Sequence, residues 1–488
     1  MASTVIKLAN RPFIVIVGLI FFSSLGFLFT LKEYLLISLF SLIIVLPLWH
    51  YPEAVILGII ACAPINRSIR NEFISVDTII HVKYALIYIA GAVWCVKRLR
   101  LPTPAPLPLW SRIFLMCWFS LTLLAAIHSI NISETIQYMF FVISGFLLFY
   151  IFLHLDAVWH KRTAVLIVCV AGVVAFLSVI EFLCATYGFF PSLNKYIISP
   201  GTQYYLSLAP DIRRLSTIYR SMGTFTHPNI LGIYLAMVAP FAGALIKAKE
   251  IGKHMQYVMR ISLVLIIAGI FVTNSRAGIL ACAVGLLYLS VHKGYRHWIT
   301  IILFTGFIVG SLYFGIPDAF MQQFDKVSRK QHGLSGRAEI WKNGLENIRQ
   351  SPWLGVGPGN ATQNTIEHNG YFIYDNIGEE YEQMNSINKT GEDIKFSFHM
   401  HNIYLQLMSE AGVFAPLLYL AGILLLIIHC ERRAGILQSF SMERGLALAV
   451  ASAAVGFIVY GFFDSQLPFT RLTLNFVAAP LLAAALRV

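Results

Sequence analysis

Apolar stretches long enough to cross a lipid bilayer recur along most of the chain. A helix needs about 20 consecutive apolar residues for one crossing, so we interpret each stretch as a transmembrane helix. The third, ninth and tenth stretches are shorter than this, so a count of twelve is the alternative to fourteen. Alternation in roughly ten-residue segments, typical of membrane β-barrels, is absent from the sequence. The predicted spans lie near residues 12–30, 34–49, 53–65, 79–96, 110–128, 137–155, 163–186, 229–246, 261–273, 277–291, 298–315, 404–429, 444–463 and 472–487.

This pattern predicts an all-α fold, a polytopic transmembrane helical bundle of 12–14 spans with one long outer loop that contains short helices. We divide it into N-terminal transmembrane helices (1–186), a transmembrane region with an Arg-bearing outer segment (187–315), the large outer loop (316–403) and C-terminal transmembrane helices (404–488). The first apolar stretch lacks a small-residue cleavage site, so we interpret it as a span.

Composition supports a membrane protein. Of 488 residues, 57% are hydrophobic and only 12% are charged, against roughly 25% charged in soluble proteins. The net charge of +12 comes from basic clusters that follow even-numbered spans. By the positive-inside rule, both termini are then cytoplasmic, and the clusters face anionic membrane lipids, not a nucleic acid. The seven cysteines show no CxxC pair, so we infer neither zinc nor a structural disulfide. We also expect no other metal and no cofactor.

Ionisable residues gather on the predicted outer side. A transporter would instead keep them near the bilayer midplane, where Lys83 and Glu181 are the main candidates. A lipid-glycan flippase therefore remains an alternative, but a site at the outer face is the simpler interpretation. The outer residues are Arg213, Arg214, Arg220, His227, Arg276, Arg337, His399 and His401.

Two short apolar runs meet at Thr273–Gly278, and Arg276 lies at the junction. An arginine at this depth is costly unless it snorkels or binds an anion. Ser, Asn and Gly supply turn geometry and free N–H groups, which suit a phosphate oxygen. A plain helical hairpin with a snorkelling arginine explains the segment equally well.

The segment YRSMGTFTHPNILG (219–232) resembles a helix start, because Pro228 is tolerated in a first turn and Thr226 can cap it. Such an N-terminus favours anions, and Arg220 precedes it. For His227, a capping or turn role is the favoured interpretation.

The long loop contains a predicted amphipathic helix at 338–348, with Ile340, Trp341, Leu345 and Ile348 on one side. Arg337 opens this helix, although an exposed loop arginine is usually solvated surface. The Gly-rich stretch SPWLGVGPGN (351–360) is interpreted as an ordered turn, not a dinucleotide-binding loop.

His399 and His401 have no third ligand at metal-site spacing. One of them is better placed as a general base at the entrance of a span, since histidine titrates near neutral pH. An ordinary interfacial histidine is the alternative. Glu410 is too far along a helix to orient the ring. Arginines and a helix N-terminus beside such a base would suit a lipid-linked diphosphate sugar donor.

Four stretches together resemble the O-antigen ligase family and the related Wzy-type polymerases, over roughly residues 210–430. Arg276 and Leu280 fit the pattern RX3L, and His401 and Gly412 fit HX10G. The stretches around Arg220 and Arg337 are similar to the rest of the shared domain.

The resemblance implies metal-independent, inverting transfer of a glycan from undecaprenyl diphosphate at the periplasmic face of the bacterial inner membrane. His401 would be the base, Arg276 and Arg337 would contact the diphosphate, and Arg220 would assist; His399, His227 and Arg214 are secondary candidates. The acceptor would be lipid A–core in ligases, another lipid-linked repeat unit in polymerases, or a protein hydroxyl.

The chain departs from the ligase pattern in two respects: it has more predicted spans than the usual twelve or so, and the loop before His401 is long. Both favour a polymerase. Against this, no glycine stands eleven residues after Arg213, Arg214 or Arg220, as the RX10G pattern of some polymerases requires. We therefore expect a ligase, with a polymerase as the alternative.

Overall fold

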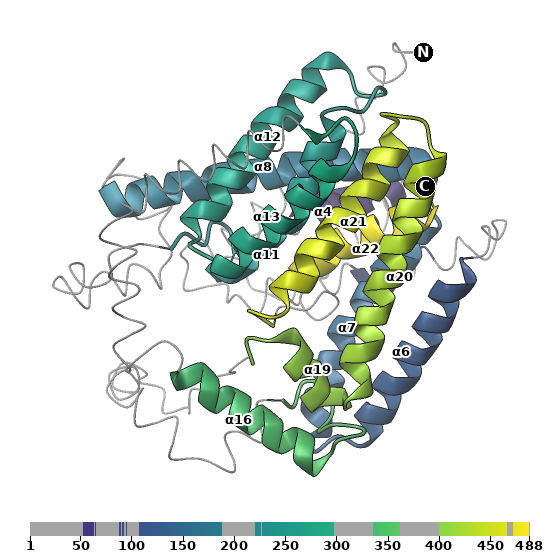
Figure 1. The fold of residues 1–488 in the computed structure, drawn as a ribbon, viewed down its shortest axis with the longest axis vertical. Helices are drawn as coiled ribbons and strands as arrows, with labels where there is room; N and C mark the ends of the chain where they lie inside the picture. The colour runs from purple at the N-terminus through teal and green to yellow at the C-terminus, as the bar shows by residue number, and fades with distance from the viewer. Residues whose placement is uncertain are drawn as a thin grey trace, which may run out of the picture.

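The computed structural model describes residues 52–62, 64, 87–88, 90–91, 94, 107–187, 220–225, 227–296, 335–361, 400–465 and 472–487. Within these ranges the regular structure is helical and contains no strand. Seven helices are long and apolar enough to cross a membrane, so the predicted all-α polytopic membrane bundle is confirmed (Figure 1). They are α6 (Leu109–Ile127), α7 (Ile132–Leu153), α8 (Ala157–Tyr187), α11 (Pro228–Leu245), α12 (Lys253–Val272), α20 (Phe414–Ile436) and α21 (Met442–Tyr460).

Five further helices are shorter: α4 (Pro52–Cys62), α13 (Arg276–Val291), α16 (Ser335–Gln350), α19 (Ile403–Ala411) and α22 (Leu472–Arg487). The predicted spans at 12–30, 34–49 and 298–315 lie outside the described residues, as does most of 79–96. The total of 12–14 spans therefore stays a prediction. The ninth span is longer than its apolar run, because α12 extends back to Lys253 and covers 20 residues.

The predicted single span at 404–429 is wrong, because two helices, α19 and α20, occupy that stretch. Gly412 separates them with a φ of +82°, a conformation that favours glycine. A Cβ atom at this position would lie 2.0 Å from the carbonyl oxygen of Trp353. The chain therefore turns at Gly412 before the long helix α20 begins.

The centre of the bundle is α11, which is buried along nearly its whole length and packs against α12, α13 and α21. It crosses α13 at very close range, since a Cβ atom on Gly278 would lie 3.0–3.2 Å from the backbone of Gly232. Such close approach between small residues is a common way to pack membrane helices. It fixes the beginnings of α11 and α13 relative to each other.

Four helices begin at the same end of the bundle, which we call the site end, and each has a side-chain cap. Asn131, His227, Ser275 and Asn402 accept hydrogen bonds from the first turns of α7, α11, α13 and α19. Of the basic residues predicted to be cytoplasmic, those that the structure describes lie at the opposite helix ends, beside the start of α8 and α12 or the end of α11, α13 and α20. They include Lys161, Lys247, Lys253, Lys293 and Arg432.

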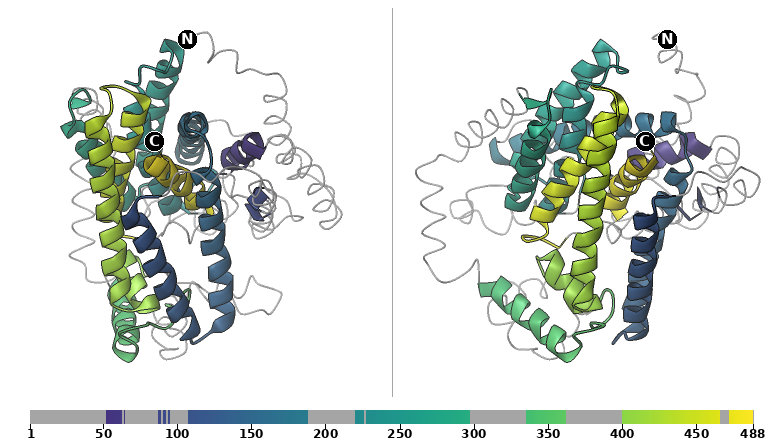
Figure 2. Two further views of the ribbon diagram at one scale, coloured as in Figure 1. Left: turned by 90° about the vertical axis from the view of Figure 1, so that its right-hand side faces the viewer. Right: turned by 45° about the vertical axis from the view of Figure 1, so that its right-hand side comes forward.

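The helices are not uniformly buried. In the apolar 18-residue stretch of α11, 83% is buried inside the protein, whereas in the corresponding stretch of α6 only 17% is buried. Helix α6 lies at the edge of the bundle beside α20, as the views in Figure 2 show. We conclude that α6 is a peripheral helix, with most of its surface available to lipid.

Candidate functional site

His401 lies directly before α19, in a backbone conformation that is uncommon for residues other than glycine. Its φ is +50°, in the left-handed region that usually carries Gly, Asn or Asp. The next residue, Asn402, caps α19 by accepting from the amide of Leu405 at 3.0 Å. The amide of Ile403 donates to the carbonyl of Gly461 at 2.8 Å, so the turn that carries His401 is fastened to the end of α21.

The acidic neighbour of His401 is Asp464, which follows α21. Its Oδ1 atom lies 3.6 Å from Nδ1 of His401, and its side chain is 1% exposed, against 32% for the histidine. Burial acts to raise the pKa of Asp464, but His401 and the amide of Ser465 outweigh it and hold that pKa below its usual range. The carboxylate therefore stays ionised beside the ring.

Sequence reasoning missed Asp464 because the contact depends on how α21 packs against α19. The available signal was an acidic residue at the end of an otherwise apolar span. Glu410, which was considered and set aside, indeed lies at the far end of α19, where it accepts a hydrogen bond from Gln406 at 3.0 Å.

A chain of hydrogen bonds continues from Asp464 to Arg220. The side-chain amide of Asn229, in the first turn of α11, donates to Asp464 Oδ2 at 2.8 Å and accepts from the guanidinium of Arg220 at 2.5 Å. Arg220 also donates through Nε to the carbonyl of Thr273 at 3.1 Å. The network therefore links the starts of α11 and α13 to the end of α21.

The segment that carries Arg220 is held by a buried acid. Glu181 of α8 accepts hydrogen bonds from the Ser221 hydroxyl at 2.5 Å and from the amides of Met222 and Gly223 at 3.0 and 2.6 Å. Glu181 thus has a local partner set at the site end, unlike the midplane charge expected of a transporter.

Arg276 is the first residue of α13 and is exposed. The turn before it confirms the predicted polar break, because Asn274 adopts a φ of +49° and Ser275 caps the helix by accepting from the amide of Gly278 at 3.3 Å. Beside it, His227 is the N-cap of α11, where its Nδ1 accepts from the amide of Asn229 at 3.1 Å. The capping role predicted for this stretch therefore belongs to His227.

Two helix N-termini consequently lie next to each other and beside Arg276. Each carries a partial positive charge from the aligned peptide dipoles. Together with the exposed guanidinium, they form an electropositive surface suited to a phosphate group.

The loop helix α16 packs against α19, the helix that follows His401 (Figure 1). It contains Arg337 in its first turn, and its Trp341 indole donates to the carbonyl of Met400, directly before His401, at 2.8 Å. The prediction of a helix here is confirmed, but Leu345 is exposed and does not belong to its buried face. Gly344 is buried instead, against the side chain of Met400.

The Gly-rich stretch at 351–361 is an ordered series of turns, as predicted. The amides of Val356 and Gly357 donate to the carbonyls of Ser409 and Glu410 at 2.9 and 3.0 Å. The Asn360 side chain donates to the hydroxyls of Ser129 and Thr135 at 2.8 and 2.9 Å. This turn fastens α19 to the beginning of α7.

The structure brings His401, Arg220, His227 and Arg276 to the same end of the bundle, and α16, whose first turn contains Arg337, packs against α19. His399, Arg213 and Arg214 lie outside the described residues, so their candidate roles stay predictions.

Part of the sequence matches the model of a known protein family. Residues 261–420 match the family model Wzy_C, O-antigen ligase, and these residues include α12, α13, α16, α19 and the candidate residues Arg276, Arg337 and His401. A search of curated proteins found no match to the chain. The family match confirms the resemblance, and it covers three of the four sequence stretches, those at Arg276, Arg337 and His401. Residues 261–420 are therefore similar to the O-antigen ligase family, which supports a ligase- or polymerase-type glycosyltransferase in a multi-pass bacterial membrane protein.

Proposed function

We propose that this protein transfers a glycan from undecaprenyl diphosphate to a sugar hydroxyl of lipid A–core, at the periplasmic face of the bacterial inner membrane. The observation that carries the proposal is the pair His401–Asp464, held 3.6 Å apart beside the N-termini of α11 and α13. A glycan transfer in which a diphosphate is the leaving group needs a base for the acceptor hydroxyl and an electropositive surface for the diphosphate.

His401 acts as the general base. Its Nδ1 is buried and turned toward Asp464, so the exposed part of the ring is the remainder, which includes Nε2. Nε2 takes the proton of the acceptor hydroxyl as the oxygen forms its bond to the anomeric carbon of the donor sugar. The ionised Asp464 stabilises the imidazolium that results, as carboxylates do in hydrolase triads.

The arginines act on the leaving group. The bond between the anomeric carbon and the diphosphate oxygen breaks, and undecaprenyl diphosphate leaves with the bonding electron pair. Arg276 and the first-turn amides of α13 bind the diphosphate and stabilise its growing negative charge. Arg337 approaches from α16, and Arg220 adds positive charge while it holds α11 and the turn at Thr273 together. His227, as the cap of α11, positions that helix.

In this scheme the transfer is a single displacement with inversion and uses no metal, because the arginines and helix N-termini neutralise the diphosphate. Polymerisation of lipid-linked repeat units is the second candidate, and the long segment between α16 and His401 favours it. The two differ only in the acceptor. Transfer to a protein hydroxyl and flipping of a lipid-linked glycan are weaker alternatives.

The test replaces His401 by Asn, which tolerates the left-handed backbone of this position but is not a base. In a strain without the chromosomal gene, we expect wild type and the control His254→Asn to restore long glycan on lipid A–core, and His401→Asn to leave bare core. His254 is an exposed residue at the other end of α12.

The acceptor is decided on the same gel of lipid A–core separated by chain length. Bare core, with long chains still on the carrier lipid, identifies a ligase, whereas core capped by a single repeat unit identifies a polymerase. Full-length glycan on core in the His401→Asn strain, at normal protein levels, would refute the proposed base.

A further inference from the structure

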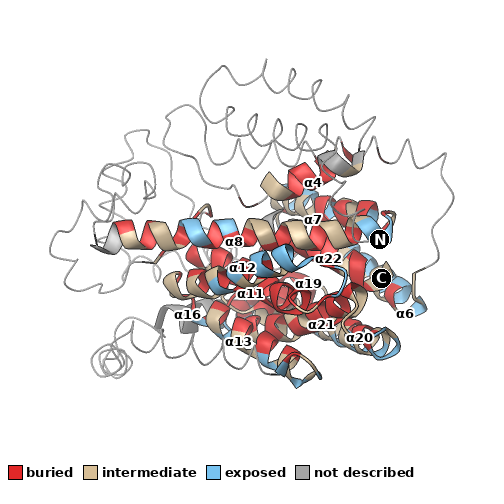
Figure 3. Cartoon of the chain, turned by 90° about the horizontal axis from the view of Figure 1, so that it is seen from above, coloured by how far each residue is buried: buried red, intermediate tan, exposed pale blue. Residues whose placement is uncertain are grey.

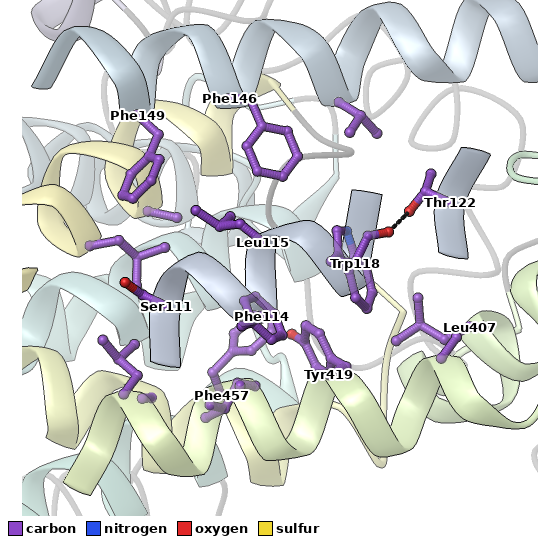
Figure 4. A pocket seen from close by; sticks show the side chains of 18 of the residues that line it. Ser111, Phe114, Leu115, Trp118, Thr122, Phe146, Phe149, Leu407, Tyr419 and Phe457 are labelled. Carbon is purple, nitrogen blue, oxygen red and sulfur yellow. Dashed lines mark hydrogen bonds between the residues drawn. The ribbon is translucent and has the colours of Figure 1, made fainter. Parts of the chain in front are cut away.

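A narrow apolar cavity of about 240 Å³ runs between α6, α7 and α20, with α21 and α22 behind it. We call it the slot. Figure 4 shows aromatic side chains from several helices around it. Those labelled are Phe114 and Trp118 of α6, Phe146 and Phe149 of α7, Tyr419 of α20 and Phe457 of α21.

The slot suits a hydrocarbon and not a glycan. Ser111 and Thr122 are the hydroxyl-bearing residues that α6 contributes, and each donates to a carbonyl near it in the chain, Pro108 and Trp118, at 2.8 Å. Their donor protons are therefore used within α6. A sugar placed here would lose its hydrogen bonds to water and gain few in return.

Lipid can reach the slot past a single helix. Its outer wall is α6, the peripheral helix, which meets α7 through the rings of Phe119 and Phe146, 5.3 Å apart. Phe119 itself is about half exposed, and its neighbour Met116 is 70% exposed. A chain from the bilayer thus has to displace only side chains of α6 to enter.

The slot borders α19, the helix that follows His401, whereas the electropositive surface lies at the starts of α11 and α13. One end of the slot is lined by Leu407 and Glu410 of α19, the helix that His401 precedes. Arg276 begins α13, which packs on α11 and α21. Seen from above, α19 lies between α13 and α6 (Figure 3).

This arrangement matches the stereochemistry of the proposed transfer. Inversion requires the acceptor oxygen to approach the anomeric carbon from the side opposite to the departing diphosphate. If the diphosphate lies at Arg276, the acceptor approaches from the side of α19 that faces the slot.

We propose that the slot binds one hydrocarbon chain of the lipid that carries the acceptor glycan. The inference rests on the proposed function and adds to it that the lipid-linked acceptor is held by its tail. A cavity of about 240 Å³ has room for part of one hydrocarbon chain, so the remaining chains of a multi-acylated lipid stay in the bilayer beside α6. The acceptor hydroxyl is then delivered to His401 by a lipid anchored in the slot.

The experiment compares acceptors with and without their lipid chain in purified, full-length protein. Leu115→Trp fills the slot, and the matched control is Met116→Trp, the next residue on α6, which faces outward. In wild type and in the control, we expect removal of the chain to lower kcat/KM for the acceptor at least tenfold. In Leu115→Trp the two acceptors should be used equally, at the lower rate.

The same variant, tested with donors of different isoprenoid length, can give a result that contradicts the proposal. If Leu115→Trp instead abolishes the effect of shortening the donor's isoprenoid, the slot holds the donor tail and the proposal is overturned. It is also overturned if neither chain effect changes. Leu115→Phe, a smaller increase in volume, is the second variant should Leu115→Trp fail to purify as a monodisperse protein.

A binding measurement separates this proposal from the proposed function. A photoactivatable palmitoyl phospholipid should label peptides of α6 and α20 in wild type and in Met116→Trp, and lose that labelling in Leu115→Trp. Absence of slot labelling in wild type overturns the slot assignment even in an active enzyme. Conversely, the slot can be labelled in a protein that transfers no glycan. That result would keep the slot as a site for a lipid chain and would refute only the proposed glycan transfer.

Discussion

Asp464, which follows α21, faces His401, which precedes α19, with its Oδ1 atom 3.6 Å from Nδ1 of the ring. Asn229 anchors the other carboxylate oxygen at 2.8 Å, so the acid is held from two sides. This ionic contact is the one that the proposed base role of His401 requires.

Replacing Asp464 by Asn should lower the turnover number by about 10²-fold or more, since general-base catalysis is typically worth 10²–10⁴-fold and the amide cannot stabilise an imidazolium. The KM for the donor should stay close to wild type, because Asp464 lies behind the ring. Initial rates at saturating donor measure the effect. The matched control is Asp156→Asn, an exposed acid after α7, and equal rates for the two variants would remove Asp464 from the mechanism.

Arg276→Ala should raise the KM for the donor about tenfold or more, because a hydrogen bond to a charged group contributes about 1.5–3 kcal/mol. Arg276→Lys should recover only part of this loss, since an ammonium cannot form the two-pronged contact of a guanidinium. Donor titration at fixed acceptor gives both values. Arg349→Ala, an exposed arginine at the end of α16, serves as the control and should behave as wild type.

Asn360→Ala should destabilise the protein and loosen α19. The buried Asn360 side chain joins Ser129 and Thr135, and leaving buried hydrogen-bonding groups unsatisfied costs about 1–3 kcal/mol. A lower Tm in detergent, together with reduced transfer, is the expected result. The exposed Gln350→Ala should leave Tm unchanged, and a wild-type Tm in Asn360→Ala would show that the turn does not hold α19.

The buried carboxyl of Glu410 should make the stability of the folded protein depend on pH. Burial raises the pKa of its carboxyl from 4.5 to about 7, only partly opposed by hydrogen bonds from Gln406, the amide of Gly359 and Tyr138. The folded state therefore binds this proton more tightly than the unfolded state, and stability falls as pH rises from about 4.5 through 7. Glu410→Gln has no proton to lose, so its stability relative to wild type should improve between pH 5 and pH 8.

The size of this gain in relative stability follows from the rise in the pKa of Glu410, which corresponds to about 3 kcal/mol when the carboxyl is fully ionised. Melting curves of both proteins at pH 5, 6, 7 and 8 measure it. A difference in Tm that stays constant across this range would contradict the raised pKa of Glu410.

Elements fixed by local sequence were predictable. The polar break before Arg276 was found because turn residues interrupt two apolar runs, and the helix after Arg337 because its apolar residues recur at helical spacing. The cap of α11 was placed within one residue, at His227, since Pro228 marks a first turn.

Features that depend on packing were not predictable. The run at 404–429 is nearly continuous in hydropathy, and Gly412 ends α19 only because the carbonyl of Trp353 approaches it. Leu345 follows the helical period but faces outward, because Met400 packs against Gly344 instead. Asp464 was missed for the same reason: its contact with His401 joins two elements that the sequence does not relate.

The left-handed backbone of His401 has a consequence for how the base can be studied. A residue with φ near +50° is more easily replaced by glycine than by alanine, whose Cβ atom strains this conformation. His401→Gly therefore keeps the turn relaxed and opens a space the size of an imidazole ring beside Asp464. Imidazole added to the solution can occupy that space, so the position offers chemical rescue: activity restored by a base that is no longer attached to the chain.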